Sequence, residues 1–215
     1  MNVQGKTVCF LGDSITEGCG ASATEKCFVS LFAAAHPATR VHNYGIGGTR
    51  IADQKVPMEL KYEFPFYTRV EQMADKADLI CVFGGTNDFG HGDAPMGTWG
   101  DKTPETFYGA LYTLSEKLLQ RYSNAKIVFF TPLHRSGETT PTKRADGMWT
   151  LADYVETVRK NAEYFSFPVL DLWKVSGMLP VTAEEREKFM PDGLHPNDAG
   201  YEKLFAIVNS FIETL

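Results

Sequence analysis

A serine, an aspartate and a histidine in this sequence have the residue types needed for nucleophilic catalysis. Ser14 stands within Gly-Asp-Ser just after the apolar run Thr7–Leu11, and Asp192 precedes His195 by three residues. A serine hydroxyl is a weak nucleophile that needs a base, and histidine titrates in the range that suits this task. A carboxylate can orient the imidazole and stabilise its charged form. The set predicts attack by Ser14 on an acyl group, with His195 as base and Asp192 as its orienting partner.

Three neutral hydrogen-bond donors are candidates for stabilising the oxyanion that such an attack produces. They are the backbone N–H of Ser14, the backbone N–H of Gly48 and the side-chain amide of Asn87. Glycine permits close backbone approach, and an asparagine amide donates without adding a positive charge. Each residue taken alone is also typical of a turn or a helix cap. Their shared position after expected strands favours an oxyanion hole.

Short apolar runs alternate with stretches of helical periodicity, which indicates βαβ units and a parallel sheet covered on both faces. The expected strands are Thr7–Leu11, Arg40–Tyr44, Leu79–Phe83, Lys126–Thr131 and Pro168–Leu170. The expected helices are Glu25–Ala35, Tyr67–Lys76, Pro104–Tyr122, Thr150–Tyr164 and Asn197–Glu213. Ligands bind beyond the carboxyl ends of the strands in such a sheet, and the candidate residues follow those ends.

The longest of these expected helices carries an apolar stripe that should pack on the sheet. Its members repeat at helical spacing and are Phe107, Leu111, Leu114, Leu118 and Leu119. No internal repeat, low-complexity tract or Pro/Ser-rich linker divides the chain. We therefore expect residues 1–215 to form a single domain.

Composition and charge exclude several classes of protein. Of the 215 residues 43% are hydrophobic and 22% are charged, which is the balance of a globular chain. A formal net charge of -6 and the lack of Lys/Arg runs interleaved with aromatics argue against nucleic acid as a partner. No apolar stretch approaches the ~18 residues of a membrane span, no signal-peptide pattern opens the chain, and the four cysteines form no C-x-x-C pair. We expect a cytoplasmic protein with a small-molecule ester as its partner and no membrane partner, and the sequence leaves its oligomeric state open.

Four blocks of this sequence resemble the signature of the SGNH hydrolases, also called the GDSL esterase/lipase family. The blocks follow the family's order and are Gly12-Asp13-Ser14, Asn43 through Gly48, Gly85-Thr86-Asn87-Asp88 and Asp192-Gly193-Leu194-His195. The resemblance implies that Ser14 is the nucleophile and one oxyanion donor. It implies Gly48, rather than Gly47, and Asn87 as the other two donors, with Asp192 and His195 completing a triad.

The same resemblance implies a fold and a lack of cofactors. The expected fold is α/β, a three-layer α/β/α arrangement with a flavodoxin-like five-stranded parallel sheet. Neither a metal nor an organic cofactor is expected. The nucleophile block reads Ser14-Ile15 where the family's older name has Ser-Leu, which is a conservative apolar change.

Motifs for other chemistries are absent or incomplete. The run Gly45–Gly48 lacks the G-x-G-x-x-G spacing of a dinucleotide loop, and the sequence has neither a phosphate-binding loop motif nor H-E-x-x-H. The G-x-S-x-G elbow of the α/β-hydrolases is missing around Ser14. His91 and Asp93 are interpreted as a solvated loop pair rather than as part of a metal site.

We therefore expect a serine esterase that hydrolyses a short-acyl ester, in particular an acetyl ester of a saccharide or other small alcohol, through an acyl-enzyme. An acyltransferase with the same first step, and a catalytically silent carbohydrate-binding module, stay open as alternatives. The long connections 89–103 and 133–149 are either substrate rims or irregular surface. Their candidates for a sugar-binding rim are Trp99, Trp149, His134 and Arg135, although the tryptophans would equally suit loop anchors.

Overall fold

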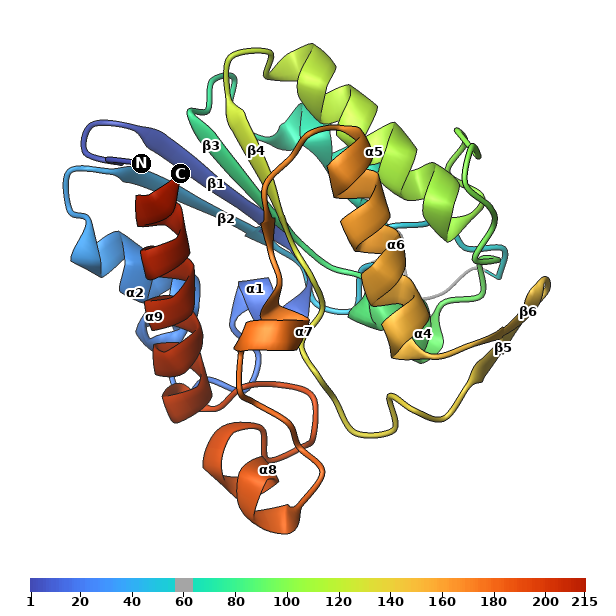
Figure 1. Ribbon diagram of the computed structural model, residues 1–215. Helices are drawn as coiled ribbons and strands as arrows, with labels where there is room; N and C mark the ends of the chain where they lie inside the picture. The colour runs from blue at the N-terminus through green and yellow to red at the C-terminus, as the bar shows by residue number, and fades with distance from the viewer. Residues whose placement is uncertain (57–63) are drawn as a thin grey trace.

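Five parallel strands form a sheet in the order β2-β1-β3-β4-β7 (Figure 1). The computed structural model describes residues 1–56 and 64–215. The strands of the sheet are β1 (Thr7–Gly12), β2 (Arg40–Gly45), β3 (Leu79–Phe83), β4 (Lys126–Phe130) and β7 (Val169–Leu170). The sequence prediction of these strands is confirmed, with no strand end displaced by more than one residue.

The central strands are buried on both faces, which explains why they are continuous apolar runs. In β1, Val8 and Phe10 belong to one apolar core, whereas Cys9 and Leu11 belong to the other. Successive side chains of a strand point to opposite faces, so a strand covered on both sides needs apolar residues at every position. The two cores lie on opposite faces of the sheet.

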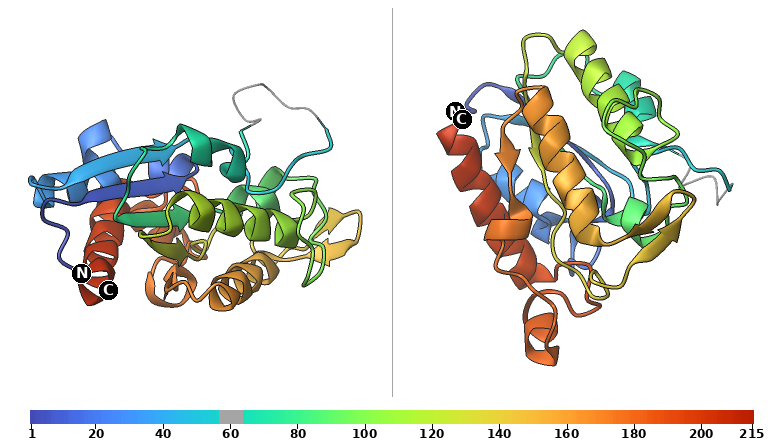
Figure 2. Two further views of the ribbon diagram at one scale, coloured as in Figure 1. Left: turned by 90° about the horizontal axis from the view of Figure 1, so that it is seen from above. Right: turned by 45° about the vertical axis from the view of Figure 1, so that its right-hand side comes forward.

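Helices cover each face (Figures 1 and 2). The helices α2 (Phe28–Ala35) and α9 (Asp198–Thr214) pack together on one face, and α5 (Phe107–Arg121) and α6 (Leu151–Tyr164) pack together on the other. This is the predicted three-layer α/β/α fold. The strand order places a topological switch point between β1 and β3, where open α/β sheets bind ligands.

Side-chain caps begin the three longest helices. Thr106 accepts from the N–H of Gly109 at the start of α5, Thr150 and Asp153 form a capping box on α6, and Asn197 accepts from the N–H of Gly200 on α9. These helices confirm their predictions to within three residues at either end. No helix within 1–56 and 64–215 is both long and apolar enough to cross a membrane.

The two shorter predicted helices differ from the structure. Residues 25–35 are split into a 3-10 turn, η1 (Thr24–Lys26), and α2, which begins at Phe28. The predicted helix Tyr67–Lys76 is wrong beyond residue 72, because α3 (Phe66–Arg69) and the 3-10 turn η3 (Val70–Gln72) are followed by extended backbone.

Tertiary hydrogen bonds replace the helical ones at this point. The Arg121 guanidinium donates to the carbonyl of Met73, and the Tyr122 hydroxyl donates to that of Ala74. The N–H of Ala74 donates to the Tyr44 hydroxyl. Backbone groups that a helix would have paired are therefore satisfied by side chains of β2 and of the C-terminal end and cap of α5.

Several short elements were not predicted as helices or strands. They are α1 (Ser14–Glu17), α4 (Thr86–His91), β5 (Thr142–Arg144), β6 (Gly147–Trp149), α7 (Leu172–Val175) and α8 (Ala183–Phe189). Two of them follow β1 and β3 directly and carry candidate residues. The pair β5 and β6 forms an antiparallel hairpin inside the long connection 133–149.

Two adjacent leucines on α5 differ in burial, which shows where the apolar stripe of this helix ends. Leu118 is fully buried, whereas Leu119 is 39% exposed, so the prediction that Leu119 packs on the sheet is wrong. Leu118→Ala should lower the free energy of unfolding by about 2–5 kcal/mol, because it leaves a cavity in the core. Leu119→Ala should cost less than half as much. Urea denaturation followed by circular dichroism measures both, and equal losses would contradict this packing.

Candidate active site

The turn from β1 into α1 positions Ser14 at the carboxyl end of β1. Ser14 is the first residue of α1, and the Asp13 carboxylate caps this helix by accepting from the N–H of Ile15 at 3.0 Å. A Cβ on Gly12 would lie 2.0 Å from the Thr16 hydroxyl, so the tight turn requires glycine. The Gly-Asp-Ser block thus has a local structural reason at each position.

Two other segments hold α1 in place. The Tyr201 hydroxyl from α9 donates to the carbonyls of Ile15 at 3.1 Å and Cys19 at 2.7 Å. The Asn43 amide at the end of β2 donates to the Thr16 carbonyl at 2.8 Å. The serine is therefore fixed from the sheet and from a helix far along the chain.

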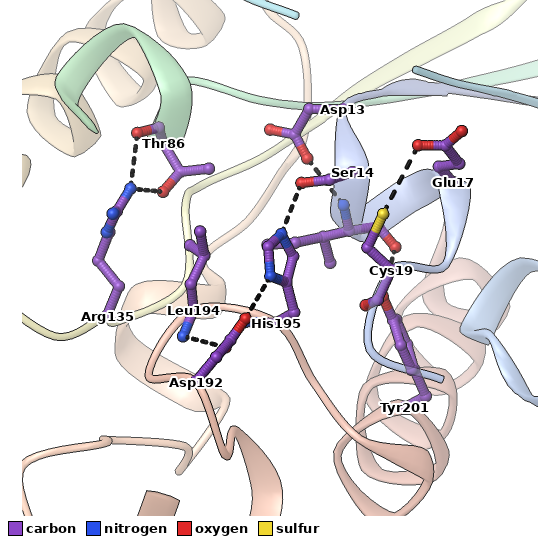
Figure 3. Close-up of polar contacts among 11 residues, drawn as sticks. Asp13, Ser14, Glu17, Cys19, Thr86, Arg135, Asp192, Leu194, His195 and Tyr201 are labelled. Carbon is purple, nitrogen blue, oxygen red and sulfur yellow. Dashed lines mark hydrogen bonds and ion pairs between the residues drawn. The ribbon is translucent and has the colours of Figure 1, made fainter. Parts of the chain in front are cut away.

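The loop before α9 carries His195 and Asp192 to Ser14 (Figure 3). One Asp192 carboxylate oxygen accepts from the backbone N–H groups of Leu194 at 2.8 Å and His195 at 2.7 Å. The other contacts His195 Nδ1 at 2.6 Å, and His195 Nε2 contacts Ser14 Oγ at 3.0 Å. The three-residue spacing lets one carboxylate orient both the loop and the ring.

The protonation states along this line suit proton transfer. Burial alone would raise the pKa of Asp192, but hydrogen bonds from the backbone and ring of His195 outweigh burial and lower it. The carboxylate is therefore ionised at neutral pH and accepts from Nδ1–H. A neutral His195 ring then has its unprotonated Nε2 facing the Ser14 hydroxyl.

Candidate oxyanion donors line the same cavity as Ser14 and His195. This cavity has a volume of about 650 Å³, and Gly48 and Asn87 are among its lining residues. Gly48 has a φ of 75°, a left-handed conformation that favours glycine. Asn87 Nδ2 donates to the Thr49 carbonyl at 3.1 Å, which fixes the amide and leaves its second N–H for another acceptor. Four of the five predicted site residues thus line one cavity, and the fifth, Asp192, reaches it through its contact with His195.

A buried arginine joins the strand ends beneath the site. Arg69 donates to the carbonyls of Tyr44 at 2.7 Å and Gly12 at 3.0 Å, and to the Thr49 hydroxyl at 3.2 Å. Burial lowers the pKa of Arg69 to about 10, which still leaves it charged at neutral pH. One guanidinium therefore ties the ends of β1 and β2 to the segment after Gly48.

A buried carboxylate holds the next part of that segment against α4. Asp88 accepts from the N–H of Ile51 at 3.0 Å and from the N–H of Ala52 at 2.9 Å. Asp88 directly follows Asn87, so the same helix that carries the candidate oxyanion amide anchors the chain after Gly48. Burial raises the pKa of Asp88 to about 6, despite these bonds.

The cavity also has lining residues that the sequence did not single out. Besides the predicted residues, it is lined by Glu17, Cys19, Ile46, Gly47, Leu194 and His91. His91 was considered only as a loop neighbour of Asp93, and that pairing is wrong. The Asp93 carboxylate accepts from the N–H groups of residues 55 and 56, whereas His91 contacts Arg50. Nearness in the sequence was a poor guide to nearness in space.

The four residues considered for a sugar-binding rim lie elsewhere. Trp99 packs edge-on against Tyr108 and Tyr164. The Trp149 indole donates to Asp146 and packs on the core, which is the role of a loop anchor. His134 contacts Glu138 and stacks near Trp173, and Arg135 donates to the Thr86 carbonyl. None of the four lines the cavity beside Ser14, as far as the described residues define it.

The five-stranded parallel sheet flanked by helices, with Ser14 at its switch point, is consistent with the SGNH hydrolase fold. The model of the GDSL-like Lipase/Acylhydrolase family matches residues 10–203. The chain belongs to this family of hydrolases, as its sequence blocks predicted.

Solved structures agree with this assignment. One protein of known crystal structure is 33% identical, with a TM-score of 0.86 over 100% of this chain and 99% of that chain. A protein from Lactobacillus plantarum is 28% identical, with a TM-score of 0.83 and 99% of both chains covered. An acetyl xylan esterase, AlAXEase, is 22% identical, with a TM-score of 0.66 over 96% of this chain and 99% of that one, and it shares the fold. No curated protein matches the chain.

Within residues 1–56 and 64–215, no group of three or more His, Cys, Asp or Glu side chains could hold a metal ion. The expectation that the protein needs no metal or organic cofactor stays a prediction.

The buried Asp13 carboxyl should make stability depend on pH. Burial raises its pKa from 3.8 to about 6, although the N–H of Ile15 and the charge of Arg69 oppose this shift. A folded-state pKa above the unfolded one means that the folded state binds the proton more tightly. The contribution of Asp13 to stability therefore falls as the pH rises from about 4 to about 6.

Asp13→Asn should remove this fall in stability, because an amide oxygen can still accept from the N–H of Ile15 but does not titrate. Relative to the unmodified protein, its free energy of unfolding should rise between pH 4 and pH 7, by up to about 3 kcal/mol. Asp13→Ala should show the same pH trend with a constant loss of about 0.5–2 kcal/mol, because the cap is missing. Urea denaturation at four pH values measures both, and a pH-independent difference would contradict the buried, raised carboxyl.

Proposed function

We propose that this protein is a serine esterase that hydrolyses a short-acyl ester, in particular an acetyl ester of a saccharide or other small alcohol. The observation that carries the proposal is the hydrogen-bonded line from Asp192 through His195 to Ser14, with 2.6 Å and 3.0 Å between its heavy atoms. That line ends in a cavity which also presents Gly48 and Asn87. A base-activated serine beside neutral donors is the arrangement that acyl transfer requires.

The first half-reaction follows from these positions. His195 Nε2 takes the Ser14 proton as Oγ bonds to the ester carbonyl carbon, and the carbonyl electron pair moves onto its oxygen. That oxyanion accepts from the N–H groups of Ser14 and Gly48 and from the Asn87 amide. When the intermediate collapses, the bond to the alcohol oxygen breaks and His195 gives its proton to that oxygen. An alcohol leaves and the acyl group stays on Ser14.

Water completes the cycle with the same groups. His195 removes a proton from a water molecule as the water oxygen attacks the acyl carbon, and the oxyanion forms again in the same donors. Collapse breaks the bond to Ser14 Oγ, which regains the proton from His195, and the carboxylic acid leaves. Asp192 stabilises the imidazolium in both halves, without itself taking a proton.

The substrate class rests on the lining of the cavity. Polar groups such as Glu17, Asn87 and His91 lie around Ser14, and the apolar side chains there are Ile46 and Leu194. Such a lining suits a small oxygen-rich ester better than a long acyl chain. A structural relative is an acetyl xylan esterase, which is compatible with this choice. A cytoplasmic location is part of the proposal and agrees with the buried free thiols of Cys9, Cys27 and Cys81.

Two variants test the proposed roles of the serine and the histidine. Ser14→Ala and His195→Ala should each lower kcat for p-nitrophenyl acetate by about 10⁴- to 10⁶-fold, because the nucleophile or its base is lost. Ser210→Ala, at an exposed position of α9, and His36→Ala, at a partly buried position just after α2, serve as controls, because neither residue lines the cavity. Comparing acetate, butyrate and octanoate gives the acyl preference, which should decline beyond butyrate. Full activity in a folded Ser14→Ala protein would rule out the proposal, and rates that rise to octanoate would rule out its short-acyl part.

The proposed oxyanion donor has a different kinetic signature. Asn87→Ala should lower kcat by about 10²- to 10³-fold with little change in KM, because the amide would bind the oxyanion rather than the ground-state ester. Steady-state kinetics on p-nitrophenyl acetate separate the two constants. A rise in KM with kcat unchanged would assign Asn87 to substrate binding instead.

Product analysis separates hydrolysis from acyl transfer. With a sugar alcohol added as acceptor, an esterase releases free acid, whereas an acyltransferase makes a new ester. A catalytically silent binding module would produce neither. The contact of His195 with both Ser14 and Asp192 supports an active site rather than a silent one.

A further inference from the structure

His91 lies on the cavity wall beside the proposed oxyanion donor. It is the last residue of α4 and stands four positions after Asn87, so the two side chains share one face of that helix. Both residues line the cavity that contains Ser14. No role in the acyl-transfer steps described above requires this histidine.

A neighbouring arginine determines which ring nitrogen of His91 carries the proton. Arg50 Nη1 lies 3.1 Å from His91 Nδ1. A guanidinium has donors and no acceptor, so Nδ1 has to be the accepting, unprotonated nitrogen. A neutral His91 ring therefore carries its proton on Nε2. Within residues 1–56 and 64–215, no side chain or carbonyl accepts from that Nε2–H.

The surroundings of His91 also keep the ring neutral. Partial burial is the largest cause that lowers the pKa of His91, and the charges of Arg50, Arg135 and Arg144 lower it further, while a contact with its own backbone opposes them. Two of these guanidiniums are anchored along α4. Arg135 donates to the Thr86 carbonyl at 3.1 Å, and Arg144 donates to the Phe89 carbonyl at 2.6 Å. At neutral pH the ring is thus a donor without a charge.

We propose that His91 is a specificity-determining residue whose Nε2–H donates to a second oxygen of the substrate, beyond the ester carbonyl. This inference rests on the proposed function, since it names what the same cavity recognises. Glu17 supplies the complementary group, because its carboxylate lines the cavity and accepts from the N–H of Gly47 at 2.8 Å. A cavity that offers both a donor and an acceptor matches an ester whose acyl or alcohol portion carries ether or hydroxyl oxygens.

The first test examines the ring itself and needs no substrate. Long-range ¹H–¹⁵N correlation spectra of the imidazoles distinguish the two neutral tautomers and the charged form. At pH 7 the His91 signals, assigned by their absence in His91→Gln, should have the neutral Nε2–H pattern. An Nδ1–H tautomer or a charged ring would overturn the inference.

The second test uses esters matched in shape and differing in one oxygen. One pair is p-nitrophenyl methoxyacetate and p-nitrophenyl butyrate, which place an ether oxygen or a methylene in the acyl chain. The other is 2-methoxyethyl acetate and butyl acetate, which do so in the alcohol. The readout is kcat/KM for the ester with the ether oxygen divided by kcat/KM for its methylene counterpart. Comparing this ratio between proteins cancels the intrinsic reactivity of each ester.

Two substitutions of His91 make the comparison specific. His91→Phe keeps a ring and removes both nitrogens, whereas a Gln at this position can accept from Arg50 and donate into the cavity. His91→Phe should lower the ratio in at least one pair by about 3- to 10-fold, the worth of one neutral hydrogen bond. His91→Gln should restore most of it. Unchanged ratios in both pairs with His91→Phe would overturn the inference.

The outcomes also separate this inference from the proposed function. If the unmodified protein hydrolyses none of the four esters, the esterase proposal fails, whatever the spectra of His91 contain. If it hydrolyses them with ratios that ignore His91, the esterase proposal stands and the specificity role is wrong.

Discussion

The contact between His195 Nε2 and Ser14 Oγ, at 3.0 Å, joins residues 181 positions apart in the chain, and the rest of the site is arranged around it. It depends on two independent placements. The turn after β1 presents the serine, and the loop before α9 presents the histidine already oriented by Asp192. Tyr201, six residues after His195 and on α9 itself, reaches back to the carbonyls of α1. The helix α9, which follows His195, therefore also fixes the position of Ser14. The distance between the two side chains is thus set by the packing of α9 against α1.

Buried charge provides the rigidity around this contact. Arg69 and Asp88 bind backbone groups of three chain segments, namely the ends of β1 and β2 and the segment that follows Gly48. Burial raises the pKa of Asp13 and of Asp88 to about 6, so their ionised forms oppose folding at neutral pH. The site is thus held in shape at some cost in stability, which is common where a fold has to position reacting groups. Asp13 and Asp88 directly neighbour Ser14 and Asn87 in the chain. Apolar side chains in their place could not accept from the backbone N–H groups of Ile15, Ile51 and Ala52.

The sequence predicted the strands well, because a buried strand is defined by local pattern, and the structure brings the three residues of the candidate triad into contact. A buried parallel strand has to be apolar at each position, and the nucleophile and histidine blocks stand at strand or helix ends that such patterns locate. The prediction failed where tertiary contacts decided the outcome. The helix from Tyr67 ends early because side chains of Arg121 and Tyr122 take the backbone carbonyls. His91 was matched with Asp93 because they are close in sequence, but its partner is Arg50, from another segment. Helical periodicity also could not show that Leu119, at the edge of the apolar stripe on α5, is exposed.

Covalent trapping tests the central claim, that Ser14 carries the acyl group, most directly. The protein would be incubated with diethyl p-nitrophenyl phosphate, which phosphorylates activated serines, and p-nitrophenolate release would be compared with the modified peptide found by mass spectrometry. The account predicts one equivalent of p-nitrophenolate released and one diethylphosphoryl group on Ser14, with neither in His195→Ala. Modification of a different residue, or equal modification of Ser14 in the absence of the His195 imidazole, would contradict it.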